Sequence, residues 1–362
     1  PEAPAGEVKP AADPVVVLER PAEPAPAAAA VPDAPTEEAK EKATFRLVHI
    51  SNVQGELEPC GCAHNPQGGL AQRATIVKGL IEDGIPTLQL DAGDLWQAEY
   101  DVPEAKGAEI DAAAELLMNA YRSYGVRGVA VGDRDLALGI KKLQQFQKKA
   151  PFALLSVNVL GENGQPVFDA SLVADVGGTK IGVIGATTAL FFNKDQRQDA
   201  DKIKIVEPAG LVAAEAKRLT ELGAKVVVLL GHLNPSEVDA CLDAAPEIQF
   251  VLGGQWLEYD QMLRAHGHAL IAGGFQRGKM LSILDAIVKD GSYSFIDRNA
   301  RGALEAKKRD LEAQLLGRQK MIESSKNDPS QKDTVKFLET NIVQLKTDLQ
   351  TATMELEDVK AP

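Results

Sequence analysis

The chain has 362 residues, of which 44% are hydrophobic, and it carries a net charge of −13. This length and composition allow a sizeable buried core. The excess of acidic side chains argues against non-specific binding to nucleic acid or to an anionic membrane, because both need a surplus of Lys and Arg.

Residues 1–44 are rich in Ala, Pro, Glu and Val and show no apolar periodicity. Such a segment cannot offset the entropy lost on ordering, so we expect a disordered tether. Ala/Pro tethers often join the membrane anchor of a bacterial lipoprotein to its folded domain, although a cytoplasmic linker has a similar composition. We therefore expect an exported protein with a lipidated Cys upstream of Pro1.

From Thr44 onward, short β-rich runs alternate with amphipathic stretches, which indicates stacked βα units. In the first half, the predicted strands are 45–50, 87–90, 128–131 and 152–158, and the predicted helices are 69–82 and 110–124. Three of these strands run into polar loops, which are Ser51-Asn52, Asp91-Ala92-Gly93-Asp94 and Gly132-Asp133-Arg134-Asp135.

The second half repeats this pattern with a hairpin and four further strands. We expect the hairpin over 167–184 with its turn at Gly177-Gly178, a helix over 210–222, and strands at 226–230, 250–252, 269–272 and 280–288. Two of these strands lead into Gly231-His232 and Gly253-Gly254-Gln255-Trp256. Five strands therefore end in Gly plus polar residues, which predicts one composite site at the carboxyl ends of the strands.

Beyond Arg301 the composition changes to Leu, Lys, Glu and Gln, with almost no Gly. Apolar residues recur there at alternating steps of three and four, which is a heptad pattern; they are Val335, Leu338, Ile342, Leu345, Leu349, Ala352 and Leu356. A looser series precedes them at Leu304, Leu311, Leu315 and Ile322. We expect 301–362 to form a helical hairpin that packs on itself. A partner-binding or dimerising coiled coil is the alternative.

The order of these motifs resembles the metallophosphoesterase fold, and most closely the N-terminal catalytic domain of the bacterial periplasmic 5′-nucleotidase family. That family has the loops T-N-D-x-H-G, G-D, G-N-H-E, S-H and G-H-x-H. The corresponding stretches here are ISNVQG at 50–55, DAGD at 91–94, GDRD at 132–135, LLGH at 229–232 and GGQWL at 253–257. The resemblance implies a four-layer α/β/β/α sandwich over about 44–290.

The family holds two divalent ions, bridged by one carboxylate, so that a bound hydroxide attacks phosphorus. The resemblance places the bridging carboxylate at Asp94 and one histidine ligand at His232, while Asp133 stands at the position of the family's Asn ligand. These three residues could retain a single metal ion, or they could be a hydrogen-bonded polar remnant.

The other ligand positions have changed. The first loop carries Asn52 and Gln54 in place of Asp and His, and the last loop carries Gln255 and Leu257 in place of two His. Neutral amides are weak ligands compared with carboxylate and imidazole, so the resemblance does not extend to a two-metal centre.

Arg134 stands at the position of the family's catalytic His. A guanidinium there could pair with Asp94 or Asp133 and so take the place of a metal charge. The same positive centre could bind a phosphate-type anion.

Cys60 and Cys62 are separated by one Gly, which is too close for a relaxed disulfide, and Cys241 is the third cysteine. The run CGCAH at 60–64 is one residue short of a haem attachment site, which excludes covalent haem. We expect a structural loop, with a redox pair or a metal site that includes His64 as alternatives. His266 and His268 are expected in a hairpin.

These observations predict an α/β protein with a tether over 1–44, a 5′-nucleotidase-like domain over 45–300 and a helical segment over 301–362. The expected function is that of a pseudoenzyme, a binding or scaffolding module in the periplasm or cell envelope of a bacterium. The alternative is an active metal-dependent phosphohydrolase acting on nucleotides or other phosphate esters.

The two interpretations differ in their cofactors. The first needs none, and the second needs a single Mn, Zn or Mg ion. We expect a protein partner or self-association through 301–362, no nucleic acid, and membrane contact only through an N-terminal anchor.

Overall fold

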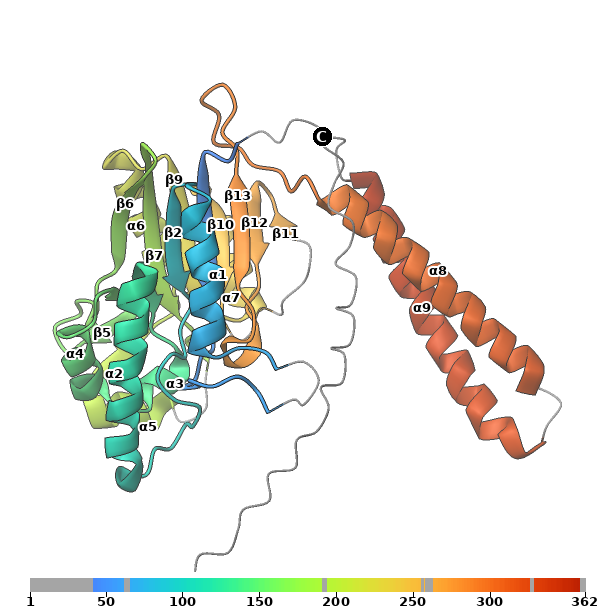
Figure 1. Ribbon diagram of the computed structural model, residues 1–362, viewed down its shortest axis with the longest axis horizontal. Coiled ribbons are helices and arrows are strands. Elements are labelled where there is room, and N and C mark those ends of the chain that lie inside the picture. Colours follow the sequence, from blue (N-terminus) through green and yellow to red (C-terminus); the bar gives the residue numbers. More distant parts are fainter. Residues whose placement is uncertain are drawn as a thin grey trace, which may run out of the picture. The chain divides into compact units, whose positions relative to one another are not determined.

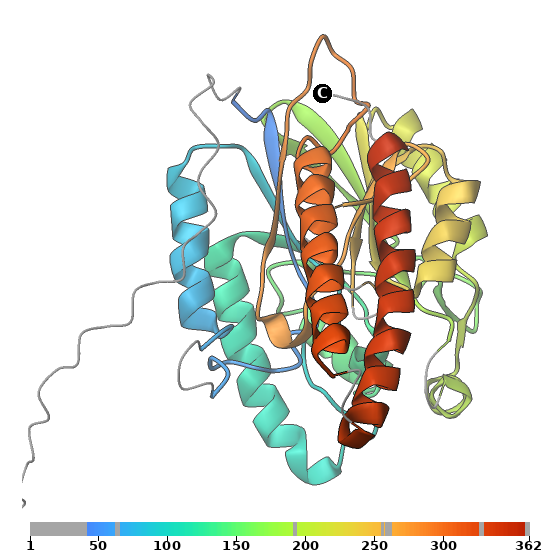
Figure 2. The same cartoon turned by 90° about the vertical axis from the view of Figure 1, so that its right-hand side faces the viewer.

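The computed structural model describes residues 42–61, 66–190, 194–254, 257, 263–325 and 329–358. Two β-sheets lie face to face, and helices cover their outer faces (Figure 1). Figure 2 shows these layers after a turn of 90°, with helices on either side of the sheets. The covering helices are α1 (Leu70–Glu82) and α2 (Gly107–Tyr124) on one side, and α6 (Ala209–Glu221) and α7 (Pro235–Ala244) on the other. The predicted four-layer sandwich is confirmed.

The first sheet has the strand order β13-β1-β2-β3-β4. Its strands are β1 (Phe45–Ile50), β2 (Thr87–Asp91), β3 (Val126–Ala130), β4 (Ala153–Leu155) and β13 (Ser282–Ala286). The first four run parallel, and β13 pairs antiparallel with β1 at the edge. The carboxyl ends of β1, β2 and β3 therefore lie at the same edge of the sheet.

The second sheet has the order β11-β12-β10-β9-β7-β6. Its strands are β6 (Ser171–Val176), β7 (Thr179–Thr187), β9 (Val226–His232), β10 (Ile248–Gly253), β11 (Arg264–His266) and β12 (Ala269–Ala272). The four inner strands are parallel, and each edge strand forms a hairpin with its neighbour. His232 pairs with Thr187 at the carboxyl end of this sheet.

Strand β9 shows why the chain folds into layers. All of its residues are buried. Alternate residues Val226, Val228 and Leu230 pack between the two sheets. Val227 and Leu229 point the other way and pack with residues of α6 and α7. A strand that is apolar on both faces is stable only when both faces are covered, so β9 lies at the centre of the second sheet.

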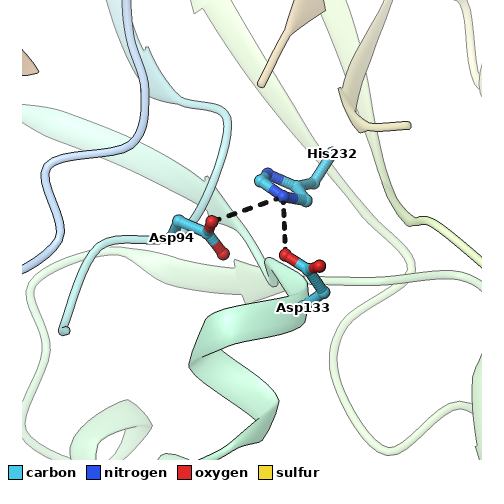
Figure 3. Close-up of side chains that lie close together, drawn as sticks. All are labelled: Asp94, Asp133 and His232. Carbon is cyan, nitrogen blue, oxygen red and sulfur yellow. Dashed lines mark hydrogen bonds and ion pairs between the residues drawn. The ribbon is translucent and has the colours of Figure 1, made fainter. Parts of the chain in front are cut away.

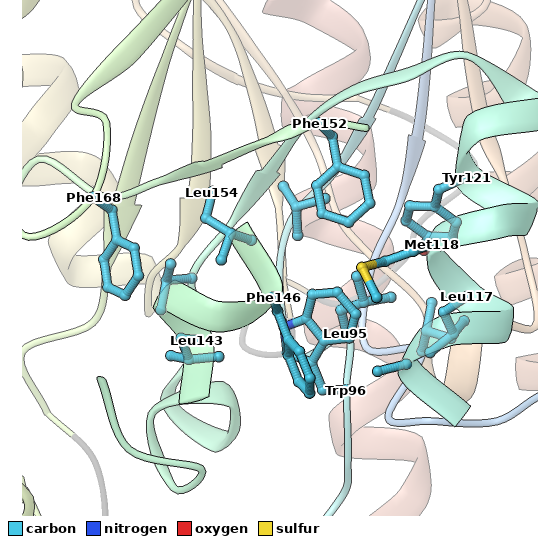
Figure 4. Close-up of a cluster of buried hydrophobic side chains, with 14 of the residues drawn as sticks. Leu95, Trp96, Leu117, Met118, Tyr121, Leu143, Phe146, Phe152, Leu154 and Phe168 are labelled. Atoms are coloured by element: carbon cyan, nitrogen blue, oxygen red, sulfur yellow. The ribbon is translucent and has the colours of Figure 1, made fainter. Parts of the chain in front are cut away.

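An aromatic cluster lies between the first sheet and its helices (Figure 4). Trp96 packs on Phe146 with ring centroids 4.7 Å apart and on Phe152 at 6.1 Å. Tyr121 of α2 contacts the same Phe152 ring at 5.5 Å. Trp96 follows the loop after β2 and is 1% exposed, so its burial anchors that loop in the core.

The C-terminal helices α8 (Ala300–Ser325) and α9 (Lys332–Asp358) pack against each other as a hairpin. Leu338 and Ala352 of the predicted heptad series are buried, as is Leu304 of the looser series before it. Leu345 of the same series is only half-buried. The predicted hairpin is confirmed, while a coiled coil with a partner stays a prediction.

Several short elements were not predicted. They are β5 (Val159–Gly161), which pairs with β8 (Ile203–Ile205), the helices α3 (Asp133–Leu136), α4 (Ile140–Gln147) and α5 (Lys194–Asp201), and the single 3₁₀ turns Glu104–Lys106, Gln276–Gly278 and Pro329–Gln331. Almost all of the predicted tether over 1–44 lies outside the described residues. Among the helices described, none is both long and apolar enough to cross a bilayer.

Candidate functional site

Three side chains from three different strand ends meet at the carboxyl edge of the sheets (Figure 3). Asp94 lies in the loop after β2, Asp133 opens α3 after β3, and His232 ends β9. One ligand atom from each lies within 4.8 Å of the other two, and all three residues are buried. The sequence prediction that these residues form one composite cluster agrees with this placement.

His232 occupies the centre of the cluster. Its Nε2 lies 3.1 Å from Asp133 Oδ1 and 3.6 Å from Asp94 Oδ2. Its Nδ1–H donates to the carbonyl of Ala92 at 3.1 Å, which directs Nε2 towards the carboxylates. Burial lowers the pKa of His232, but the carboxylates of Asp94 and Asp133 outweigh this effect and raise it to about 10. The imidazole is therefore a cation here at neutral pH.

Arg134 brings a second positive charge to the same carboxylates. Its Nη1 donates to Asp94 Oδ2 at 2.9 Å. Its backbone N–H lies 3.0 Å from Asp94 Oδ1 and 3.1 Å from Asp133 Oδ1. The guanidinium lies over the Tyr100 ring, 4.9 Å from its centroid, and the Tyr100 hydroxyl donates to Asp133 Oδ2 at 3.1 Å. The Arg134 side chain thus binds the Asp94 carboxylate directly.

The two carboxylates differ in their pKa. Burial raises the pKa of Asp94, and the positive charges of His232 and Arg134 oppose this effect. Burial acts in the same direction on Asp133, but its hydrogen bond with His232 prevails and holds the pKa of Asp133 below its usual range. Both oxygens of Asp94 accept hydrogen bonds from Arg134, which is the contact pattern of an ionised carboxylate.

Asp135 positions the cluster, and sequence analysis did not identify it as a site residue. Its carboxylate accepts the backbone N–H groups of Asp94, Leu95 and Gly132 at 2.9 Å each, and that of Trp96 at 3.2 Å. These bonds tie the loop after β2 to the start of α3. Burial raises the pKa of Asp135 to about 6, against the effect of these backbone donors.

A series of buried hydrogen bonds between side chains holds the start of the loop after β2. Asp91 Oδ1 accepts the N–H of Gly93 at 2.9 Å, and its other oxygen accepts the hydroxyl of Tyr121. Arg73 Nη1 donates to that hydroxyl at 3.1 Å. Burial raises the pKa of Asp91 to about 7. Helices α1 and α2 therefore hold the start of the loop that carries Asp94.

The first loop lies against the site but no longer offers strong ligands. The backbone N–H groups of Asn52 and Gln54 donate to the carbonyls of Gly93 and Asp94 at 2.8 Å each. Asn52 and Gln54 have positive φ angles of 53° and 55°, a conformation that few non-glycine residues adopt. Asn52 is 1% exposed, and its Oδ1 has no hydrogen-bond partner among the described residues. This oxygen is a further acceptor in the first loop.

The last loop contributes no ligand in the part that is described. Leu257 is 6% exposed and packs in the apolar cluster of α6, α7 and β10. Its backbone N–H donates to Gly254 at 3.2 Å, and its carbonyl accepts the N–H of Gly274 at 3.0 Å. Gln255 lies outside the described residues. An apolar side chain thus fills space where the family has a histidine.

The other candidate residues that are described have partners of their own elsewhere in the fold. Cys60 Sγ accepts the N–H of Gln67 at 3.2 Å, within the loop before α1. Cys62 and His64 lie outside the described residues. Cys241 is buried in α7, and burial raises the pKa of its thiol to about 12, so it is an unreactive core residue. His266 lies in the β11–β12 hairpin, and its Nε2 lies 2.7 Å from Asp243 Oδ1.

Known proteins resemble this chain in sequence and in fold. The snake venom 5′-nucleotidase of Gloydius brevicauda is 26% identical over 224 residues, which are 58% of this chain and 36% of that protein. A 5′-nucleotidase precursor from Thermus thermophilus superposes with a TM-score of 0.56 at 21% identity, covering 70% of this chain and 53% of that one. The calcineurin-like phosphoesterase YfkN from Bacillus subtilis superposes with a TM-score of 0.56 at 16% identity. The superposition covers 68% of this chain and 86% of that one. No family model matches the chain.

The part of the chain from β1 to β13 therefore has the metallophosphoesterase fold. More narrowly, it is a 5′-nucleotidase-like domain. The chain spans only about a third of the length of the curated relatives it matches, since it covers 36% of the Gloydius enzyme.

The donor set decides how many metal ions the site fits. Asp94, Asp133 and His232 offer two carboxylates and one imidazole within 4.8 Å, a set that suits one zinc or manganese ion. Bound there, such an ion would act as a Lewis acid. Among the described residues no comparable donor set for a second ion is found, because Leu257 has no donor atom and the first loop offers only amides in Asn52 and Gln54.

Proposed function

We propose that this chain is a catalytically degenerate 5′-nucleotidase-like domain that serves as a binding or scaffolding module in an exported bacterial protein. The observation that supports this most is the 2.9 Å ion pair between Arg134 Nη1 and Asp94 Oδ2. It engages the carboxylate that the family uses to bridge two metals. A fixed guanidinium neutralises that carboxylate but cannot bind and activate a water molecule.

The rest of the donor set supports the same proposal. Hydrolysis by this fold needs a hydroxide held between two cations and a group that stabilises the leaving oxygen. Here the first loop has Asn52 and Gln54, and the family's catalytic His is replaced by Arg134, whose side chain is 17% exposed and bound to Asp94. The neighbouring buried carboxylates of Asp91 and Asp135 accept backbone N–H groups and so hold the geometry of the loops.

We propose further that helices α8 and α9 supply a surface for a protein partner or for a second copy of the chain. Several large apolar side chains of the hairpin are exposed, and apolar surface of this kind is typical of interaction sites; they are Leu316, Met321, Phe337, Val343 and Met354. Residues of the heptad series such as Leu345 also stay half-buried, so a further helix could cover them.

The Ala/Pro-rich composition of 1–44 supports a place in the bacterial periplasm or cell envelope, because it fits a spacer outside the folded domain. The similarity to a protein found in snake venom is in keeping with an exported domain.

A second candidate function is that of a single-metal phosphohydrolase. The convergence of Asp94, Asp133 and His232 favours it, because these side chains form a one-ion ligand set. The relatives named as 5′-nucleotidases also favour it, with nucleotides or other phosphate esters as substrates.

Metal content and turnover test the two candidates together. The protein is purified without chelator, its zinc and manganese are measured by mass spectrometry, and hydrolysis of AMP and p-nitrophenyl phosphate is followed in added Mn²⁺ or Zn²⁺. We expect much less than one equivalent of metal and no turnover above that of Asp94→Ala. One equivalent with turnover would support the second candidate, and two equivalents with turnover would overturn the proposal.

Self-association is tested with the chain alone. We expect analytical ultracentrifugation to show a species above the monomer mass, and Leu345→Glu to return it to a monomer with the melting of the β1–β13 domain unchanged. Thr347→Glu, at an exposed position of the same helix, is the matched control. A wild-type chain that stays monomeric at high concentration would leave only a different protein as the partner.

A further inference from the structure

Asp94 Oδ2 faces two positive groups at once. Arg134 Nη1 lies 2.9 Å from it, and His232 Nε2 lies 3.6 Å from it. A metal ion held by Asp94, Asp133 and His232 would need the same oxygen, because it is the Asp94 oxygen nearest to the imidazole. We propose that the Arg134 guanidinium is a built-in replacement for a divalent ion, and that its removal turns this cluster into a metal site.

The inference rests on the proposed function, since a metal-loaded wild-type protein would not need this replacement. The first support for it is the negative charge of the two carboxylates. Asp94 and Asp133 are buried side by side, at 0% and 1% exposure. Two buried carboxylates are stable only when cations or hydrogen bonds compensate them. Arg134 supplies one of those cations directly, and without it the two carboxylates face a single imidazole.

The second support for the replacement is the spacing of the three donor atoms of Asp94, Asp133 and His232. Ligand atoms held about 2.1 Å from a zinc ion in a tetrahedron lie about 3.4 Å from one another. His232 Nε2 lies 3.1 Å from Asp133 Oδ1 and 3.6 Å from Asp94 Oδ2, so these distances match that spacing. The Nδ1–H bond to Ala92 also leaves Nε2 as the ring nitrogen that faces the two carboxylates.

The third support for the replacement is that the Arg134 side chain is held in place by its neighbours. Arg134 is fixed by its own backbone N–H, which bonds to Asp94, and by the Tyr100 ring beneath it at 4.9 Å. Tyr100 in turn donates to Asp133. A tethered cation with this support competes with a dissolved ion at high effective concentration. Metal binding by the wild-type chain is therefore suppressed by competition, while the three ligands stay in place.

The test measures zinc binding by calorimetry on the full chain, without reference to activity. Arg134→Ala should bind one Zn²⁺ at least tenfold more tightly than wild type, and added EDTA should lower its melting temperature but leave that of wild type unchanged. Arg134→Gln removes the charge and keeps a shorter polar side chain at this position. This variant should show the same gain in zinc affinity. It replaces Arg134→Ala in the test if the alanine variant does not fold.

A double variant separates this site from surface zinc binding. Exposed groups such as His266 with Asp243 could take zinc in any variant. Arg134→Gln combined with Asp94→Asn should therefore return to the wild-type affinity. A folded Arg134→Gln protein that binds zinc no more tightly than wild type would overturn the inference.

The failure of this inference is distinct from that of the proposed function. The proposed function fails if the wild-type protein hydrolyses phosphate esters with bound metal. The inference fails if both Arg134 variants fold and neither gains affinity for zinc, whatever the wild-type turnover.

Discussion

His49 lies on β1 on the same face as Phe45 and Leu47, which pack between the two sheets. It is 1% exposed, and its Nε2–H donates to the carbonyl of Gly253 at 2.9 Å. Its Nδ1 has no hydrogen-bond partner in the described part of the chain. Burial lowers the pKa of His49 to about 4. The imidazole is thus neutral in the fold at neutral pH.

This buried histidine predicts a loss of stability in mild acid. The unfolded chain protonates His49 below pH 6.5, whereas the folded chain does so only below about pH 4. The unfolded state therefore binds more protons in this window, and stability falls as the pH falls. With about 1.4 kcal/mol per pKa unit, His49 should account for about 3 kcal/mol of that loss.

Urea unfolding at pH 7 and pH 4 measures this loss. His49→Gln keeps a donor for Gly253 but cannot titrate, so its free energy of unfolding should fall by about 3 kcal/mol less than that of wild type. His268→Gln, at an exposed position, should behave as wild type. Equal pH profiles for His49→Gln and wild type would contradict the assignment of His49 as a neutral buried group.

Residues whose role depends on motif order were predictable, and residues whose role depends on backbone contacts were not. Asp94, Asp133 and His232 each follow a strand at the same sheet edge, so the sequence pattern brings them together. Asp135 acts through the N–H groups of four residues, including Leu95 and Trp96 across the loop after β2. The position of Asp135, three residues after Gly132, could have indicated its role. An acidic side chain at that position of a helix accepts the backbone N–H of the residue that caps the helix.

At the scale of elements, the hairpin of α8 and α9 depends on a few well-buried contacts. Leu338 is 4% exposed, whereas Val343 on the same helix is 67% exposed. Leu338→Ala removes buried apolar surface and leaves a cavity, so we expect the hairpin to lose about 2–3 kcal/mol of stability. Val343→Ala should change it by less than about 0.5 kcal/mol.

Hydrogen exchange followed by mass spectrometry is the measurement, because it reports α8 and α9 separately from the sheets. Faster exchange is expected in both helices of Leu338→Ala, with unchanged exchange in β9 and β10. If the two variants exchange alike, Leu338 does not hold the hairpin together.

The elements that were predicted have strong periodicity, and those that were missed are short. Strand β1 was predicted with the bounds that the structure shows, Phe45–Ile50. Helix α7 was not predicted, although Asn234 caps it, Pro235 begins it and Glu237 completes a capping box. These are recognisable start signals. Helix α4 has only eight residues, too few to give a clear repeat.

At the scale of the whole molecule, the chain after β13 returns to the core. The Phe295 ring lies 4.8 Å from that of Phe250 and 6.1 Å from that of Phe45, so it packs at the edge of the space between the sheets. Asp297 Oδ2 also accepts the N–H of Leu263 at 3.2 Å. The β1–β13 domain therefore extends past its last strand.

This return predicts where the chain can be shortened. A chain that ends at residue 299 should melt as the domain of the full chain does, because it keeps Phe295 and Asp297. A chain that ends at 290 loses the burial of one aromatic ring and its ring contacts, which we expect to cost about 3 kcal/mol. Thermal unfolding of both shortened chains and of Phe295→Ala measures the difference. An equal stability of both shortened chains would show that the segment 291–299 contributes nothing.

The stacked βα units were predictable from the alternation of strands and helices, and the four-layer sandwich was predicted from the resemblance in motif order. The chemistry at the sheet edge was less predictable. Motif order placed Arg134 beside two carboxylates, but the choice of Asp94 as its side-chain partner depends on the helical turn at Asp133 and on Tyr100 beneath the guanidinium. These are contacts between loops, and no periodicity encodes them.

The ion pair between Arg134 and Asp94 also affects how the domain matures. A metal-dependent relative must acquire its ions from its surroundings, where copper binds nitrogen and oxygen ligands more tightly than zinc or manganese and can occupy the wrong site. A cation that is part of the polypeptide arrives with every copy and needs no loading step. Folding of this domain should therefore be insensitive to metal starvation and to excess copper in its surroundings.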